Sequence, residues 1–213
     1  MSEHEHDPLR LYNSFYGRGG WVYDEARERS MLALIAERAG WRPGDRVVEI
    51  GAGLGEHSEL LRQMGYDVTA VELSPVGCDA ARDRYPELHV VCASVTSWKP
   101  RYKGHIFARG MSFYHYELAG VNCQGIDVPA ETARMMRLWV RVGSTFVLQI
   151  ATDFTGRRPH PHVHHNAAED YEGLFSPHGQ VDLYDWQGVR VDEGGRRQGV
   201  ICVTRKARKA RKP

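Results

Sequence analysis

Short apolar runs alternate along this chain with segments whose apolar residues recur at helical spacing. We expect strands at residues 47–50, 68–73, 88–93, 104–110, 144–151, 180–186 and 199–206. We expect helices at residues 24–39, 56–64, 74 to about 84, 129–142 and 169–175. This alternation predicts an α/β fold, a doubly wound and mostly parallel sheet of seven strands with helices on both faces.

The end of the sheet breaks this pattern. Only residues 187–198 separate the last two predicted strands, which is too short for a crossover helix. These two strands should therefore form a hairpin, and the C-terminal strand should run antiparallel to the others.

A glycine turn, residues 51–55, lies between the first predicted strand and the helix that follows it. Ligands of open parallel sheets bind at the carboxyl ends of the strands, and glycine lets a ligand lie directly against the backbone. The dinucleotide fingerprint is G-x-G-x-x-G, but here the third glycine comes one position early and Glu56 takes its place. A carboxylate there would repel a pyrophosphate at the helix N-terminus, so the turn favours a nucleoside without phosphates.

Two further strand ends offer groups that a nucleoside needs. Glu72 ends the second predicted strand, where a carboxylate can accept hydrogen bonds from ribose hydroxyls. The alternative is a solvated carboxylate at the end of a strand. The third predicted strand is followed by "ASVTSW", which places Ala93, Ser94 and Val95 where an adenine edge could be read.

The segments "VVEIGAGLG", "VTAVELS" and "ASVTSW" resemble the successive motifs of class I S-adenosylmethionine-dependent methyltransferases, over roughly residues 39–204. The resemblance implies a Rossmann-like sheet and S-adenosyl-L-methionine as cofactor. It implies that Gly51 and Gly53 face the methionine part, that Glu72 holds the ribose, and that Ser94 and Val95 edge the adenine. The family usually has an acid where this chain has Ser94, so the adenine contact departs from its pattern. The remaining residues expected at the cofactor are Tyr16, Trp21, Glu49, Ala52, Leu73, Arg109, Gly110 and Ser112.

The segment after the fourth predicted strand bears on the methyl acceptor. Its "RG-x-S-F", residues 109–113, resembles a segment of small-molecule methyltransferases, including glycine N-methyltransferase-like enzymes. By that resemblance Arg109 and Ser112 lie near the methionine moiety. The Asn/Asp-Pro-Pro-aromatic motif of nucleic-acid and protein-glutamine methyltransferases is not found here, so we expect a small-molecule acceptor.

His115 is the candidate catalytic base, because histidine titrates near neutral pH. A structural or substrate-orienting histidine is the equal alternative. A strand-like alternation would put Tyr114 and Tyr116 on the face opposite His115, and Tyr114 is a candidate substrate residue.

The N-terminal segment "LYNSFYGRGGWVYDEA" is aromatic and rich in glycine, and we expect no regular structure in it. In the family such a segment often folds over the cofactor as a lid, and Phe15 and Tyr16 would then touch the substrate. Packing on the outside of the sheet is the alternative. We divide the chain into residues 1–40 as lid and helix, residues 41–204 as methyltransferase core, and residues 205–213 as a basic, disordered tail.

A histidine-rich loop follows the fifth predicted strand. Alternate histidines can bind a metal in an extended loop, but no cysteine is near and few acids are, so we predict no metal site. We expect a long acceptor-side loop, with Asp153 and Arg157 at its base selecting the substrate. The histidines are His160, His162, His164 and His165.

Composition narrows the partners and the location. The net charge is +1, but the tail "RKARKARKP" is entirely basic and leaves an acidic body, which does not favour a nucleic-acid partner. No apolar run is long enough to span a bilayer and no signal peptide is visible, so we expect a cytoplasmic protein that does not associate with membranes. The four cysteines are scattered and are expected to be free thiols. We leave a homodimer open.

The predicted function is therefore S-adenosylmethionine-dependent N- or O-methylation of a small molecule, of the kind found in natural-product or secondary metabolism, by in-line methyl transfer. Two alternatives stay open from the sequence. One is an NAD(P)-dependent oxidoreductase on a Rossmann sheet, against which Glu56 and the early glycine count. The other is a non-catalytic cofactor-binding subunit.

Overall fold

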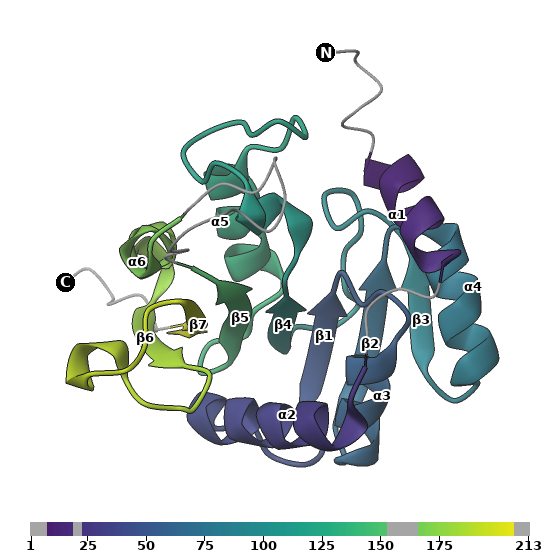
Figure 1. Ribbon diagram of the computed structural model, residues 1–213, viewed down its shortest axis with the longest axis horizontal. Helices are drawn as coiled ribbons and strands as arrows, with labels where there is room; N and C mark the ends of the chain where they lie inside the picture. The colour runs from purple at the N-terminus through teal and green to yellow at the C-terminus, as the bar shows by residue number, and fades with distance from the viewer. Residues whose placement is uncertain (1–7, 19–22, 153–165, 207–213) are drawn as a thin grey trace.

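The computed structural model describes residues 8–18, 23–152 and 166–206, and in them a seven-stranded sheet forms the centre of the molecule (Figure 1). The strand order is β3-β2-β1-β4-β5-β7-β6. Strands β1 to β5 are parallel to one another, and β7 is antiparallel to both β5 and β6. The predicted fold class and the C-terminal hairpin are therefore confirmed. The strands are β1 (Arg46–Ile50), β2 (Asp67–Glu72), β3 (His89–Cys92), β4 (His105–Arg109), β5 (Thr145–Ala151), β6 (Gln180–Asp185) and β7 (Gly199–Arg205).

Helices cover both faces of the sheet and bury two apolar clusters. On one face, Leu32, Ile35 and Leu61 of α2 and α3 pack against Val47 and Phe107 of the strands. The other face is covered by α5 and α6 and contains the larger cluster. The α-helices are α1 (Pro8–Tyr16), α2 (Glu25–Ala39), α3 (Glu56–Gln63), α4 (Pro75–Arg84), α5 (Val128–Leu138) and α6 (Ala168–Phe175), and the 3-10 turns are η2 (Ser112–His115), η3 (Ser176–His178) and η4 (Val191–Glu193).

The N-terminal segment differs from the prediction, because residues 8–16 form the helix α1 instead of an irregular stretch. Leu9, Tyr12, Asn13 and Tyr16 recur at the spacing of one helical face, and this pattern stabilises the helix. The aromatic and glycine-rich composition of the whole stretch masked the pattern. Figure 1 shows α1 lying beside α4, above the carboxyl end of β2.

Two boundaries also differ. Helix α5 ends at Leu138 rather than at residue 142, because the chain turns there and Val140 forms a parallel bridge with Gly104. The folded body extends beyond residue 204, since Arg205 completes β7. Lys206 then donates from Nζ to the carbonyls of Val140 at 2.9 Å and Arg137 at 3.2 Å, which satisfies carbonyls at the end of α5.

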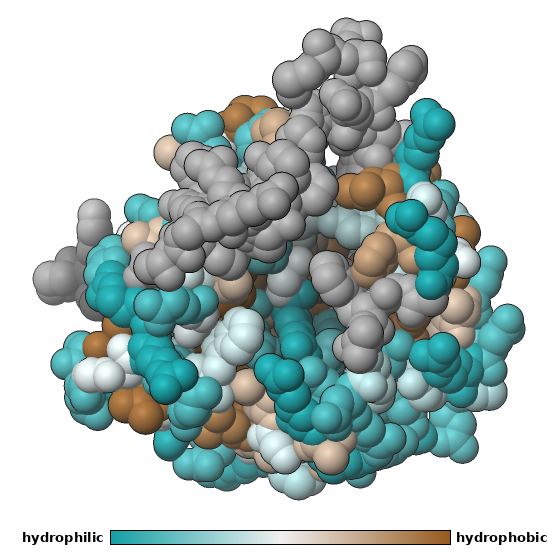
Figure 2. Space-filling view, in the orientation of Figure 1, coloured by the Kyte–Doolittle hydropathy of each residue, from teal (hydrophilic) through white to brown (hydrophobic). Residues whose placement is uncertain are grey.

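The surface is mainly hydrophilic on the face seen in Figure 2, and its hydrophobic residues lie in small separate groups. Leu9 and Leu11 of α1 are among the exposed apolar side chains. No helix in the described ranges is long and apolar enough to cross a membrane.

Candidate active site

The parallel strands β1 to β4 end at one edge of the sheet, and most of the predicted site residues meet there. The glycine turn follows β1, Glu72 ends β2, Ser94 follows β3, and Gly110 follows β4. The prediction that these residues lie close together therefore depends on one feature, the common direction of these four strands.

The glycine turn has the conformation that its residues suggest. Gly51, Gly53 and Gly55 all have positive φ, of 71°, 58° and 82°. Gly51 is exposed, whereas a Cβ at Gly55 would meet Ala81 and Leu88 at 3.1 Å. The early third glycine thus permits close packing inside the protein, and the first glycine leaves backbone open at the edge.

Glu72 is buried with its carboxylate beside this turn. It accepts hydrogen bonds from the backbone N–H groups of Gly53 at 2.9 Å and Ser74 at 2.8 Å. Burial raises the pKa of Glu72, and the two backbone hydrogen bonds oppose that rise. A carboxylate has about four acceptor positions, so Glu72 keeps capacity for ribose hydroxyls. Leu73, which follows it, is half-buried.

Helix α1 covers the same corner. Ser74 donates from Oγ to Oδ1 of Asn13 at 2.6 Å, next to the backbone N–H that binds Glu72. The Tyr16 hydroxyl lies 3.2 Å from where a Cβ at Gly53 would be, and the Tyr16 ring also contacts Gly77 of α4. Tyr16 therefore lies at the predicted cofactor corner. Phe15 packs edge-on against Tyr16, with ring centroids 5.5 Å apart.

The end of β3 carries the two residues predicted at the adenine edge. The Ser94 hydroxyl bonds within its own turn, to the Thr96 hydroxyl at 2.8 Å. Val95 is buried, and its carbonyl accepts from Arg134 of α5. The Ser94 side chain thus bonds locally, whereas the Val95 side chain belongs to the larger apolar cluster.

Arg109 is directed toward α2 and α3. Its guanidinium binds the Glu28 carboxylate with both Nη atoms, the Nη2–Oε1 distance being 3.1 Å, and its Nη1 lies 2.6 Å from Nε2 of His57. Glu49 is buried and accepts from the Ser58 hydroxyl, and Nδ1 of His57 lies 3.6 Å from it. Both of these partners of Glu49, Ser58 and His57, come from α3.

The electrostatics of this group are strongly perturbed. Burial opposes the charge of Glu28, but hydrogen bonds from His57 and Arg109 outweigh it and lower the Glu28 pKa to about 2. Burial would lower the pKa of His57, but its hydrogen bonds to Glu28 and Glu49 outweigh burial and raise it to about 9. Arg109 opposes this rise, because Nε2 of His57 can accept from a guanidinium N–H only while it is unprotonated.

The segment after β4 corrects one prediction and places two others. Residues 112–115 form the 3-10 turn η2 rather than a strand-like stretch, so the expected alternation is wrong. Tyr114 is fully buried in the core, where its hydroxyl lies 3.1 Å from that of Thr132, so it does not line a substrate site. Ser112 donates from its hydroxyl to Oε1 of Gln124 at 3.4 Å.

His115 is half-buried beside Gly110, whose α-carbon would carry a Cβ 3.5 Å from Nε2 of the imidazole. Burial lowers the pKa of His115, and a hydrogen bond to the Gly110 backbone opposes this. The imidazole is therefore neutral at neutral pH and able to accept a proton.

Some predicted residues lie outside the described ranges: Trp21, Asp153, Arg157 and the four histidines of the loop. Within the described ranges, no group of three or more His, Cys, Asp or Glu side chains is arranged to hold a metal ion.

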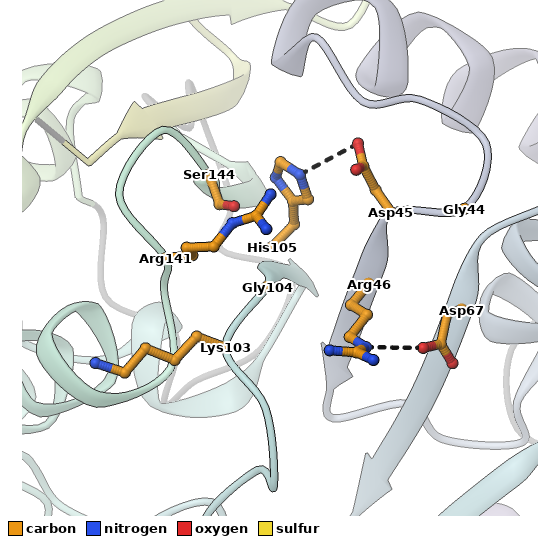
Figure 3. A pocket seen from close by; sticks show the side chains of 9 residues that line it. All are labelled: Gly44, Asp45, Arg46, Asp67, Lys103, Gly104, His105, Arg141 and Ser144. Carbon is orange, nitrogen blue, oxygen red and sulfur yellow. Dashed lines mark hydrogen bonds and ion pairs between the residues drawn. The ribbon is translucent and has the colours of Figure 1, made fainter.

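Figure 3 shows a pocket of about 170 Å³ at the opposite edge of the sheet, where the amino ends of β1, β2, β4 and β5 meet. An ion pair and a histidine–carboxylate contact line it: Arg46 lies 3.0 Å from Asp67, and His105 lies 3.5 Å from Asp45. Burial lowers the pKa of His105 to about 4. None of the residues predicted for the cofactor or the acceptor contributes to this pocket.

Sequence reasoning missed several residues at the carboxyl edge. His57 follows the glycine turn by two positions, and that closeness was an available signal. Tyr12 and Asn13 could have been found from the helical spacing in α1. Glu28 carries no local signal, because only the packing of α2 brings it to Arg109.

The residues present fit an S-adenosyl nucleoside. The backbone is exposed at Gly51 and Gly110, so a ligand can lie against it. A Cβ at Gly51 would occupy the space between this backbone and Met111, 3.6 Å from the Met111 side chain. The Glu72 carboxylate beside the turn suits ribose hydroxyls, and the Arg109 guanidinium and Glu28 carboxylate are of the charge types that complement an amino acid.

Comparison with known proteins agrees with this geometry. A family model described as a methyltransferase domain matches residues 48–117. A protein-L-isoaspartate O-methyltransferase of Methylorubrum extorquens is 43% identical over 58 residues, which are 27% of this chain and 25% of that protein. The chain thus matches about a quarter of the length of its curated relatives.

Solved structures match over nearly the whole chain. The sugar N-methyltransferase KedS8 from Streptoalloteichus sp. is 18% identical with a TM-score of 0.63, covering 92% of each chain. The glycopeptide N-methyltransferase MtfA, solved with sinefungin, is 18% identical with a TM-score of 0.62, covering 89% of this chain and 90% of that one. At this identity the likeness shows the fold. The predicted resemblance to class I S-adenosylmethionine-dependent methyltransferases is therefore confirmed: residues 48–117 match a methyltransferase-domain model, and the chain has the fold of these enzymes.

Proposed function

We propose that this protein transfers a methyl group from S-adenosylmethionine to a nitrogen or oxygen of a small molecule. The observation that carries the proposal is the meeting of the open glycine turn and the buried Glu72 carboxylate at the carboxyl edge of the sheet. These are the groups that hold an adenosyl ligand without phosphates. When bound, the cofactor would supply a methyl group on a sulfonium: the lone pair of an oriented acceptor would bond to the methyl carbon in line as the carbon–sulfur bond breaks, with S-adenosylhomocysteine as the leaving group.

The residues of this chain then have separate tasks. Glu72 binds the ribose hydroxyls, and Gly51 and Gly53 allow the ligand to lie against the backbone. Tyr16 and the rest of α1 exclude water from the nucleoside corner. His115, kept neutral by burial, takes the proton of an acceptor that is protonated at neutral pH.

A small acceptor is supported by the full-length structural neighbours, whose names describe sugar and glycopeptide N-methyltransferases. The protein-methylating relatives match over a short segment only. Nitrogen and oxygen acceptors both fit a neutral imidazole at the β4 end of the site.

Two measurements test the proposal in sequence. Calorimetric titration should show binding of S-adenosylhomocysteine and none of NADH, whereas binding of NADH alone would support the oxidoreductase instead. The protein is then incubated with a metabolite extract and cofactor bearing a deuterated methyl group. A labelled product that is seen by mass spectrometry with the wild type and lost with Glu72→Ala shows catalysis. The absence of a labelled product from several extracts rich in amines and hydroxyl compounds would favour a non-catalytic subunit.

A further inference from the structure

Cys78 of α4 and Cys92 of β3 are two free thiols on elements that pack against each other (Figure 1). Cys78 is fully buried and lies on the buried face of its helix. Cys92 is exposed and is the last residue of β3, which forms one edge of the sheet. Val90 packs into the apolar cluster of the α2 and α3 face, and residues two apart in a strand share a face, so Cys92 lies on that face too.

A contact between Arg82 and Val90 shows how α4 and β3 are aligned. Arg82 donates from Nη2 to the Val90 carbonyl at 3.3 Å. The helix and the strand run in opposite directions, because α4 connects the parallel strands β2 and β3. Cys78 lies about 6 Å back along the helix from Arg82, and Cys92 lies roughly 6.6 Å further along the strand than Val90. The two cysteines are therefore at the same level of the structure.

Strand β2 fixes the position of the Cys78 thiol. Its Sγ donates to the carbonyl of Glu72 at 3.5 Å. The register of β2 with β3 pairs Glu72 with Cys92, and neighbouring strands lie about 4.8 Å apart. Burial raises the pKa of the Cys78 thiol, and the neighbouring Cys92 thiol raises it further. The two sulfur atoms are thus neighbours, one inside the protein and one at its surface.

We propose that Cys78 and Cys92 form a reversible disulfide when the protein meets a peroxide, with Cys92 oxidised first because it is the exposed thiol. Sγ of Cys92 attacks one oxygen of hydrogen peroxide, the O–O bond breaks, and one water leaves as a sulfenic acid forms on Cys92. Sγ of Cys78 then attacks that sulfur, the S–O bond breaks, and a second water leaves with the proton of the Cys78 thiol. The two thiols lose two electrons, which reduce one peroxide to two water molecules.

The disulfide ties the end of β3 to α4 beside the nucleoside corner. A disulfide S–S distance is about 2.05 Å, well inside the contact distance of two free thiols, so closure draws the two elements together. The edge strand moves more easily than α4, because β3 pairs with β2 alone. Ala93 donates its N–H to the Glu72 carbonyl at 2.9 Å and precedes Ser94, so this movement loosens the segment that borders adenine under the proposed function. The effect on binding rests on that function, whereas the disulfide itself does not.

The first test uses the whole chain and hydrogen peroxide. Reduced protein is treated with peroxide, its remaining thiols are blocked with N-ethylmaleimide, and it is digested without reductant. Trypsin separates the two cysteines into the peptides 63–82 and 85–101, so a bond between them is seen by mass spectrometry as a linked pair. Cys92→Ser and Cys78→Ala each remove one thiol, and Cys123→Ser is the matched control because Cys123 is also exposed.

The wild type should give the linked pair, lighter by two hydrogen atoms than the sum of the two peptides, and dithiothreitol should abolish it. Cys92→Ser should leave Cys78 as a free thiol, because peroxide does not reach the buried sulfur. Cys78→Ala should stop at the sulfenic acid of Cys92, which dimedone captures. Cys123→Ser should give the same linked pair as the wild type.

The second test measures the dissociation constant of S-adenosylhomocysteine by calorimetry before and after oxidation. Oxidised wild type should bind at least about threefold more weakly, the loss expected when roughly one hydrogen bond weakens. Dithiothreitol should restore the affinity. Peroxide should leave the affinity of Cys92→Ser unchanged, which separates the disulfide from oxidation of methionine.

The outcomes separate the disulfide from its effect and from the proposed function. A bond between Cys92 residues of two molecules, or oxidation of Cys123 with no linked pair, would overturn the disulfide. Equal affinity of oxidised and reduced wild type would overturn its effect on the site alone. A reduced protein that does not bind S-adenosylhomocysteine would refute the proposed function, and the linked peptides would still decide the disulfide. If Cys78→Ala does not fold, Cys92→Ser decides the question, because its change is at an exposed position.

Discussion

Replacing Glu72 with glutamine tests the nucleoside corner most directly, since the change keeps the shape and removes the charge. The native carboxylate accepts one backbone N–H on each oxygen, from Gly53 and from Ser74. A glutamine amide has one oxygen, so one of these N–H groups is left facing an NH₂. We expect this to lower the free energy of unfolding by roughly 1–3 kcal/mol, partly offset because a buried charge is also removed.

The effect on binding adds to the effect on folding. Loss of charge-assisted hydrogen bonds to the ribose should weaken S-adenosylhomocysteine by at least about 1.4 kcal/mol, or tenfold. Calorimetry gives the dissociation constant, and urea unfolding of the same sample gives the stability. Asp79→Asn is the matched control, because Asp79 is exposed on α4 and its pair with Arg82 is a surface ion pair.

Glu72 also predicts a pH dependence. Burial raises its pKa, so the carboxylate takes up a proton at a higher pH than an ordinary glutamate as the solution is acidified. Wild-type affinity should therefore fall as pH drops from neutral, and Glu72→Gln should bind equally weakly across the range. A folded Glu72→Gln protein with wild-type affinity would refute the ribose assignment.

Three further predictions concern the neighbouring residues. His115→Gln should lower turnover by about 10²–10⁴ and leave S-adenosylhomocysteine affinity within twofold. Burial lowers the His115 pKa, so protonating the native imidazole costs folding free energy. The free energy of unfolding of the wild type should therefore decline below about pH 6.5, and that of His115→Gln should decline less. Superimposable pH–rate profiles of the two proteins would exclude a base. Tyr114→Phe should leave turnover unchanged and cost about 1 kcal/mol of unfolding free energy, through its bond to Thr132; a large kinetic defect would return it to the site. Tyr16→Ala should weaken S-adenosylhomocysteine about threefold to tenfold by opening the nucleoside corner, and unaltered affinity would rule out a covering role.

The sheet could be predicted from the sequence because its strands are short apolar runs with marked ends. Ser74 accepts from the Gly77 N–H at the start of α4, and Gly40 ends α2 in the left-handed conformation, and both signals are local. Helix α1 was missed because its helical spacing lies within a stretch whose composition suggests a loop. The end of α5 was missed because a bridge from Val140 to a distant segment sets it.

The candidate site divides in the same way. Residues placed by strand direction, such as Gly51 and Glu72, were predictable because parallel strands end together. Tyr114 was misplaced because its direction depends on whether residues 112–115 form a strand or a 3-10 turn, and the pattern is too short to distinguish them. The partner of Arg109 depends on how α2 lies across the sheet, which no local motif encodes.

The two N-terminal helices meet the carboxyl edge at different places, and this divides their effect on a ligand. Helix α1 reaches the β2 end through the bond between Asn13 and Ser74, and α2 reaches the β4 end through Glu28 and Arg109. Under the proposed function, the first contact borders the ribose and the second borders the amino acid. Changes in α1 should therefore weaken the binding of S-adenosylhomocysteine and of 5′-methylthioadenosine, which lacks the amino-acid group, to the same extent. Changes at Glu28 should weaken only the binding of S-adenosylhomocysteine. The N-terminal segment would then act as two independent parts of the binding site rather than as a single lid.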